Sequence, residues 1–333
     1  MGDDYRGFER AAAVLTSPRP TPSRVSPHTG TAGVVVPTHN DGANIGPLLA
    51  RLLAEPDVRE VVVVASGCDD DTVAIVLETA NDHDGRVRLY VEPERSGKVS
   101  AVNFGLAETK MPFRVVVSGD VLPEPGAIGL LIKALRRPGV GLAGGRPRPV
   151  NPDSYAVGHA VQLLWRLHHR LALHQPKLGE MIAIRAEALV SLPRTSVDEA
   201  CFQALIENAG WKSAYVADAV VLNQGPCTVR DFVKQRRQIH TGHLWLRHRT
   251  HYTVPSLRDG LLLTEMWRDL TAAPERLRPR RLAWTAGAVA MEAGARLLAR
   301  FDFLRGRENH VWDMVKSTKA PAADAYGMVA GGS

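Results

Sequence analysis

The chain has 333 residues, of which 45% are hydrophobic and 23% charged, and it carries a net charge of +6. This composition is typical of a globular protein with one large or two small domains, and the length allows a sizeable core. The basic balance fits phosphate-bearing ligands, nucleic acid or an anionic membrane surface, although it equally serves solubility.

Cysteine spacing and apolar patterning exclude two classes of protein. Cys68, Cys201 and Cys227 are far apart and form no C-x-x-C pair, which excludes a disulfide framework and indicates a reducing compartment. The N-terminal MGDDYRGFER lacks the apolar core of a secretory signal. The most apolar late stretch, residues 282–291, is shorter than the roughly 20 residues of a spanning helix. We therefore expect a cytoplasmic protein without transmembrane helices.

The first 120 residues predict alternating strands and helices after a flexible tail at residues 1–30, which ends in a Pro-, Ser- and Arg-rich stretch. Strands are expected at 34–36, 60–66, 87–93 and 113–120, and helices at 44–56, 69–82 and 98–110. This alternation indicates a doubly wound α/β fold with a mostly parallel, Rossmann-like sheet flanked by helices. Ligands bind such sheets beyond the carboxyl ends of the strands, where Thr38, Ser66, Glu92 and Asp120 fall.

The remaining chain is more helical. Helices are expected at 126–139, 154–175, 198–211 and 228–252, a strand that leaves the sheet at 140–150, a strand and a short helix at 181–193, and a strand pair at 212–223. Residues 256–333 read as largely helical. We expect a catalytic domain over 31–250 and a helical C-terminal extension over 251–333.

Two polar turns precede predicted helices. In PTHND, Pro37 ends a strand and Thr38 and Asp41 follow, so the turn can hold a nucleotide at a helix N-terminus or can simply cap the helix. In ERSGKVSAVN, Arg95 and Lys98 flank Gly97, so the turn can hold a diphosphate or be a solvated basic turn.

Acidic residues mark two further stretches. In VVVSGDVLPEP, Asp120 follows a buried strand, and such a hard carboxylate can hold Mg²⁺ or Mn²⁺ against phosphates. Pro123 and Pro125 separate it from the next helix, which weakens the alternative of a helix cap. Asp198 and Glu199 open a helix whose dipole keeps a carboxylate ionised, so either can accept a proton, or both can be ordinary helix-start residues.

Taken in order, the motifs PTHND, SGCDDDT, SGKVSAVN, SGDV, VDEA…AGW and QRRQIHTGH resemble the inverting family 2 glycosyltransferases, which have the glycosyltransferase A fold. The resemblance covers roughly residues 32–245. It implies a nucleotide-sugar donor, a divalent metal (Mn²⁺ or Mg²⁺) and a single-displacement transfer that inverts the anomeric centre.

The resemblance assigns roles residue by residue. Glu199 matches the catalytic base and Asp198 the acid before it, while Asp120 matches the metal ligand. The residues implied in nucleotide-sugar binding are Pro37, Thr38, Asp41, Ser66, Lys98, Ser118, Gln235 and Arg236.

Several positions depart from the family pattern. Ser118 replaces the first acid of the D-x-D motif, so His240 or His243 is a candidate second metal ligand, although a satisfied histidine is the alternative for each. Ala65 and Ser66 stand where an aspartate usually reads uracil, which puts a uridine donor in doubt. The Arg-Trp of Q-x-x-R-W is missing, which argues against processive synthesis.

The sequence therefore predicts a non-processive glycosyltransferase that acts on an acceptor hydroxyl or amine of a small molecule, glycan or lipid carrier. A sugar nucleotidyltransferase and a catalytically silent partner of another transferase are the alternatives. Nucleic acid is not expected as a partner, because aromatic residues are sparse around the basic helix. The apolar face of 282–304, flanked by arginines, can pack as a lid, form a homodimer or lie on the inner face of a membrane.

Overall fold

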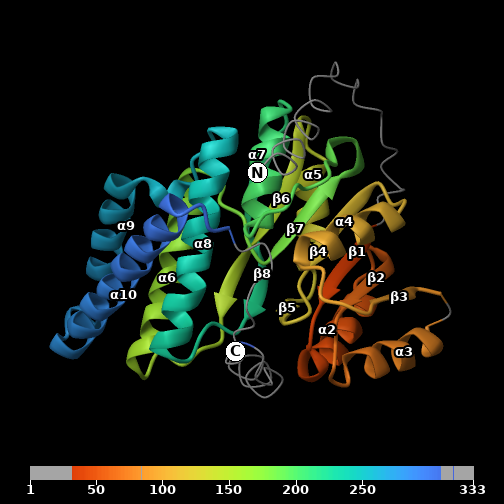
Figure 1. The fold of residues 1–333 in the computed structure, drawn as a ribbon, viewed down its shortest axis with the longest axis horizontal. Coiled ribbons are helices and arrows are strands. Elements are labelled where there is room, and N and C mark those ends of the chain that lie inside the picture. Colours follow the sequence, from red (N-terminus) through yellow and green to blue (C-terminus); the bar gives the residue numbers. More distant parts are fainter. Residues whose placement is uncertain (1–31, 84, 309–317, 319–333) are drawn as a thin grey trace.

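The computed structural model describes residues 32–83, 85–308 and 318 (Figure 1). The tail predicted at 1–30 lies outside these residues. A single sheet runs through the molecule with helices on both faces, and two further helices, α9 and α10, form an outer layer over α6 and α8 (Figure 1).

In the described part of the chain, eight strands form one mixed sheet in the order β3-β2-β1-β4-β7-β6-β8-β5. The strands are β1 (Ala32–Thr38), β2 (Val58–Ser66), β3 (Val87–Glu92), β4 (Phe113–Val117), β5 (Val121–Pro123), β6 (Val140–Pro149), β7 (Met181–Arg185) and β8 (Lys212–Asn223).

The helices match the predicted pattern closely. They are α2 (Gly42–Ala54), α3 (Thr72–Asp82), α4 (Lys98–Glu108), α5 (Ala127–Leu135), α6 (Ala156–His174), α7 (Asp198–Asn208), α8 (Val229–Thr250), α9 (Asp259–Thr271) and α10 (Pro279–Leu304), with short 3₁₀ helices η1 (Ala186–Ala188), η2 (Pro255–Leu257) and η3 (Pro274–Leu277).

The parallel half of the sheet confirms the α/β reading. Strand β1 pairs in parallel with β2 and β4, and β2 pairs in parallel with β3. Val34 and Val36 pack in a core with residues of α2, α3 and α5, whereas Val35 packs with residues of α4 and α7. Because successive strand residues point to opposite faces, this valine run requires a sheet that is covered on both sides.

The other half of the sheet corrects two expectations. Strand β6 does not leave the sheet; it lies between β7 and β8. Residues 142–144 pair with β7, while Pro147 and Pro149 pair only with β8, so each proline occupies a stretch of β6 that has one open edge. Residues 212–223 are one strand, β8, rather than a pair. The short strand β5, directly after Asp120, was not anticipated and pairs antiparallel with β8.

The helical C-terminal part, α9 and α10, packs on α6 and α8. An apolar cluster joins Val161 of α6, Phe232 of α8 and Ala288 of α10. No helix among the described residues has the length and apolar character to cross a membrane.

Candidate active site

The turn between β1 and α2 is built around the carboxylate of Asp41, which is only 2% exposed. Thr38 Oγ1 donates to Asp41 Oδ2 at 2.7 Å, and the His39 amide donates to the same oxygen at 3.1 Å. The Asp41 amide in turn donates to Thr72 Oγ1 at 2.8 Å, which ties the turn to the start of α3. The turn is therefore fixed before any ligand binds.

The end of β4 lies directly against this turn. The Gly119 amide donates to the Pro37 carbonyl at 3.2 Å. A Cβ atom on Gly119 would lie 2.5 Å from Asp41 Oδ2 and 2.7 Å from Thr38 Oγ1, so only glycine fits this approach. Asp120 consequently lies beside the β1 turn.

Ser66, at the end of β2, holds the basic turn that precedes α4. Ser66 Oγ donates to Glu92 Oε2 at 2.6 Å and accepts from the Ser96 amide at 3.1 Å. The Ser66 carbonyl lies 2.8 Å from His39 Nδ1. The ends of β1, β2 and β3 are thereby linked to the segment that carries Lys98.

Lys98 joins α4 to the acidic start of α7. Its Nζ lies 2.9 Å from Asp198 Oδ2 and 3.0 Å from Glu199 Oε1. Burial and then the charge of Glu199 raise the pKa of Asp198. Burial acts in the same direction on Glu199, but the charge of Lys98 and a hydrogen bond with Asp198 outweigh it, so the pKa of Glu199 is lowered. The pair thus holds one carboxylate that stays ionised and one that titrates closer to neutral pH.

Glu180 is a residue of this site that sequence reasoning missed. It adopts a left-handed backbone conformation with φ of 62° directly before β7. Because β7 pairs antiparallel with β4 and Met181 lies opposite Val117, Glu180 falls next to the Ser118–Asp120 segment. Burial, followed by the charges of Glu199 and Asp120, raises the pKa of Glu180 to about 8.

Lys177 was also missed, and it lies on the loop before β7. Burial, with the neighbouring charge of Arg236, lowers the pKa of Lys177 to about 7. The only local signal was the sequence KLGE between a helix and a strand, which does not identify a site by itself.

Helix α8 supplies the remaining side of the site. Gln235, Arg236 and His243 line the cavity, but His240 does not. His240 Nε2 instead lies 2.7 Å from Glu292 Oε1 of α10, and its side chain is 2% exposed. Burial and the charge of Arg236 lower the pKa of His240 to about 4.

These groups surround one cavity of about 330 Å³. Twelve of the thirteen residues selected from the sequence line it: Pro37, Thr38, Asp41, Ser66, Lys98, Ser118, Asp120, Asp198, Glu199, Gln235, Arg236 and His243. Glu180, Lys177, Arg95 and Thr318 line it as well. The cavity lies at the carboxyl ends of the parallel strands, as expected for a doubly wound sheet.

A divalent cation suits the oxygen-rich side of this cavity, although no group of three or more His, Cys, Asp or Glu residues within the described ranges forms a complete cation site. Magnesium commonly takes only one or two protein carboxylates and completes its coordination with substrate phosphates and water. The raised pKa of Glu180 reflects burial together with the crowding of Glu199 and Asp120. Asn223 Oδ1, beside Glu180, is buried with no hydrogen-bond partner among the described residues. Both observations fit a cation held by Asp120 with few other protein ligands.

Comparisons with known proteins bear on the family and the fold of the chain. Residues 33–193 match the model of glycosyl transferase family 2. The fold is similar to that of the mannosyltransferase PcManGT from Pyrobaculum calidifontis, solved in complex with GDP-Man and Mn²⁺, with a TM-score of 0.57 and 22% identity over 99% of this chain and 94% of that one.

Two curated relatives share part of the sequence. The succinoglycan biosynthesis protein ExoU of Rhizobium meliloti (strain 1021) is 32% identical over 99 residues, which is 30% of this chain and 29% of the relative. The dolichyl-phosphate beta-glucosyltransferase ALG5C of Trichomonas vaginalis (strain ATCC PRA-98 / G3) is 30% identical over 110 residues, again 30% of this chain and 32% of the relative. The chain spans about a third of the length of either relative.

The family match covers the segment that carries the turn of β1, the basic turn before α4 and the acid after β4. The sheet and its flanking helices have the glycosyltransferase A fold of the solved neighbour. Residues 33–193, just under half of the chain, therefore match glycosyl transferase family 2.

Proposed function

We propose that this protein transfers a sugar from a nucleotide-diphosphate sugar to a hydroxyl or amine of an acceptor, with inversion at the anomeric carbon. The observation that carries the proposal is the meeting of Asp120, Asp198 and Glu199 with Lys98 in one cavity at the carboxyl ends of the parallel strands. The family match and the GDP-Man and Mn²⁺ bound to the structural neighbour support it.

The Asp198–Glu199 pair is suited to accept the acceptor's proton. Glu199 stays ionised because Lys98 is 3.0 Å away, whereas the pKa of Asp198 is raised by burial and by Glu199. Glu199 is therefore the unprotonated base at neutral pH, and Asp198 beside it can share the proton taken from the acceptor. The acceptor oxygen or nitrogen then attacks the anomeric carbon from the face opposite the leaving nucleotide.

Asp120 and Glu180 are suited to hold a divalent cation beside the donor diphosphate. When bound, the cation supplies positive charge that stabilises the departing diphosphate. Arg236 lines the same cavity, and its guanidinium adds a fixed positive charge for phosphate oxygens. Thr38 and Asp41 shape the turn in which the nucleoside is expected to lie.

The proposal predicts donor cleavage that depends on Asp120. The purified protein is incubated with UDP- and GDP-sugars and Mn²⁺, and the release of nucleoside diphosphate and of pyrophosphate is measured. We expect nucleoside diphosphate, and Asp120→Asn should lower its rate about 100-fold or more, because the variant loses the charged ligand of the cation.

Asp218→Asn is the matched control, since Asp218 is exposed on β8 and does not line the cavity. It should leave the rate unchanged. Release of pyrophosphate would instead identify a nucleotidyltransferase. Full activity of Asp120→Asn would exclude the role of Asp120, and the absence of cleavage with every donor would contradict the transferase itself.

A further inference from the structure

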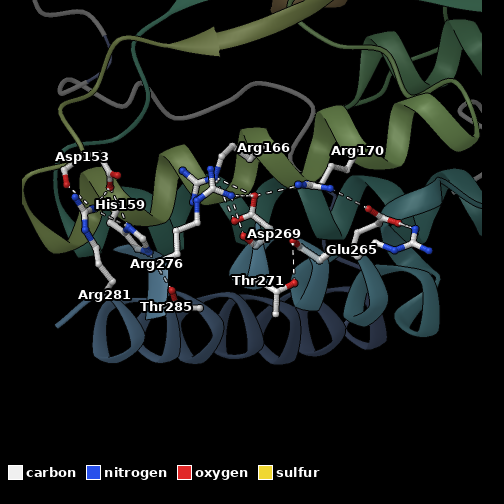
Figure 2. A network of polar contacts seen from close by, with 11 residues as sticks. Asp153, His159, Arg166, Arg170, Glu265, Asp269, Thr271, Arg276, Arg281 and Thr285 are labelled. Carbon is white, nitrogen blue, oxygen red and sulfur yellow. Dashed lines mark hydrogen bonds and ion pairs between the residues drawn. The ribbon is translucent and has the colours of Figure 1, made fainter. Parts of the chain in front are cut away.

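The inner face of helix α9 is charged where a packed helix is normally apolar. Glu265 and Asp269 are only 2% and 1% exposed, and both point towards α6 (Figure 2). Asp269 Oδ1 lies 3.2 Å from Arg166 Nε, and Glu265 Oε1 lies 3.0 Å from His174 Nε2. The α9 helix is therefore held on the catalytic part largely through ion pairs.

Helix α10 repeats this arrangement against α8. Its buried residues are small or polar, namely Thr285, Ala288, Ala295, Ala299 and Asp302. Glu292 forms a two-bond ion pair with Arg236, and both hydrogen bonds measure 2.9 Å. Asp302 pairs with Arg237 through bonds of 2.5 and 2.6 Å. Charged and small side chains thus face the protein along the helix.

The large apolar side chains of both helices face outward instead. On α9, Leu263 and Trp267 are 59% and 68% exposed. On α10 the exposed apolar residues recur at helical spacing along one stripe. These residues are Leu282, Val289, Leu297, Leu298, Phe301 and Leu304, and the last is 81% exposed. We call the exposed apolar residues of α9 and α10 the outer apolar face. A contiguous surface of this kind on a soluble protein is typical of a docking site.

The exposed charges along α10 are all positive, whereas α9 and η3 add the exposed carboxylates Asp259 and Glu275 beside exposed arginines. The exposed charged residues between positions 278 and 307 are arginines, and the carboxylates of Glu292 and Asp302 point inward to α8. The exposed arginines are Arg278, Arg280, Arg300, Arg305 and Arg307. Such a basic rim attracts anionic groups, and it would oppose a second copy of the same face through repulsion of like charges.

We propose that the outer apolar face lies flat on an anionic lipid surface. Leu297, Phe301 and Trp267 would enter the boundary between headgroups and acyl chains, while the arginines meet lipid phosphates. The helix lies in the interface because its other face is bound to α8 by ion pairs. This inference does not depend on the proposed glycosyl transfer, and its test needs no enzymatic activity.

The test is co-sedimentation of the full chain with vesicles of phosphatidylcholine alone or mixed with phosphatidylglycerol. We expect binding to the mixed vesicles that weakens as salt is raised, because the attraction of arginines to anionic lipid is screened. Leu297→Glu and Phe301→Glu should each lower the partition coefficient about tenfold, because each places a carboxylate where lipid is expected. The double change of Arg300→Gln and Arg305→Gln should lower it only for vesicles that contain phosphatidylglycerol.

Leu77→Glu is the matched control. Leu77 is 48% exposed on α3, at the opposite side of the molecule from α10 (Figure 1), and this variant should bind vesicles like the original chain. Unchanged thermal unfolding of all variants confirms that they fold. Two results would overturn the proposal: no binding to mixed vesicles, or a stable dimer in sedimentation velocity that Leu297→Glu separates, since a second copy would then cover the face.

Discussion

At the scale of single residues, the site depends on one lysine ammonium that lies between two adjacent carboxylates. Lys98 contacts both Asp198 and Glu199, and their carboxylates raise the pKa of Lys98 well above its ordinary value even though burial opposes this. The ammonium is therefore charged throughout the physiological range. It allows two neighbouring carboxylates to remain in a partly enclosed cavity at the start of α7.

Lys98→Met should move the acidic limb of the kcat/KM profile to higher pH. Without the ammonium, the pKa of Glu199 rises, so the base becomes protonated at a pH where the original site is still active. A shift of about one pH unit is expected, and it is measured from donor cleavage between pH 5 and 9. Lys133→Met, on the exposed side of α5, is the control. A lower rate with an unmoved limb would mean that Lys98 binds substrate without tuning the acids.

At the scale of secondary structure elements, α10 reaches the site through a single carboxylate. Glu292 binds Arg236 with two hydrogen bonds and also contacts His240, while the side chains of Arg236 and Glu292 are 12% and 22% exposed. Arg236 lines the cavity, so the orientation of its guanidinium depends on a helix outside the family match.

Glu292→Gln should raise the KM for the nucleotide-sugar donor several-fold and lower the free energy of unfolding by about 2–3 kcal/mol. The loss of stability follows because a largely buried arginine loses its charged partner. Asp302→Asn is the matched control, since it frees Arg237, which does not line the cavity and is 38% exposed. It should leave the donor KM unchanged. Equal effects of the two variants on KM would show that Glu292 acts only through the packing of α10. Glu292→Asp keeps a carboxylate at this position, so it should restore KM in part if the carboxylate itself matters.

The elements that sequence could predict are those whose signal is local. Valine runs and apolar residues at helical spacing predict the parallel strands and α2 to α4, because these signals depend on nearby residues alone. The positions of β5, β6 and β8 depend on pairing between distant segments. The prolines of RPRP indicate a strand with one open edge. A strand that leaves the sheet has such an edge, but so does β6, which pairs only with β8 at these prolines.

The same limit applies to the candidate site. Residues at the ends of parallel strands, such as Thr38 and Asp120, could be selected because parallel topology alone brings them to one edge. Glu180 could not, since its position follows from the antiparallel register of β7 against β4. The contact of His240 with Glu292 depends on where α10 docks, and no pattern in either helix specifies that docking.

At the scale of the whole molecule, buried imidazoles link stability to pH. His168 of α6 and His243 of α8 are 5% and 7% exposed, and the Nδ1 atom of each has no hydrogen-bond partner among the described residues. Burial, together with the nearby charge of Lys177, lowers the pKa of both rings well below the ordinary value. Asp198 contributes with the opposite sign, because its raised pKa favours the folded state at lower pH. The free energy of unfolding of the original chain therefore changes with pH by the difference between these two effects. A variant is needed to separate them.

His168→Leu isolates the imidazole contribution. The unfolded chain binds a proton on this histidine as the pH falls below about 6.5, whereas the folded chain does not, so His168 makes folding less favourable towards acid. The variant should gain up to about 2 kcal/mol relative to the original chain between pH 7.5 and pH 5, measured by urea unfolding at each pH. His248→Leu is the control, because it removes an exposed imidazole from the same chain. If the difference in the free energy of unfolding between His168→Leu and the original chain did not vary with pH, the ring would be protonated within the fold. The positive charges of Lys177 and Arg236 would then not be arranged around the cavity as described.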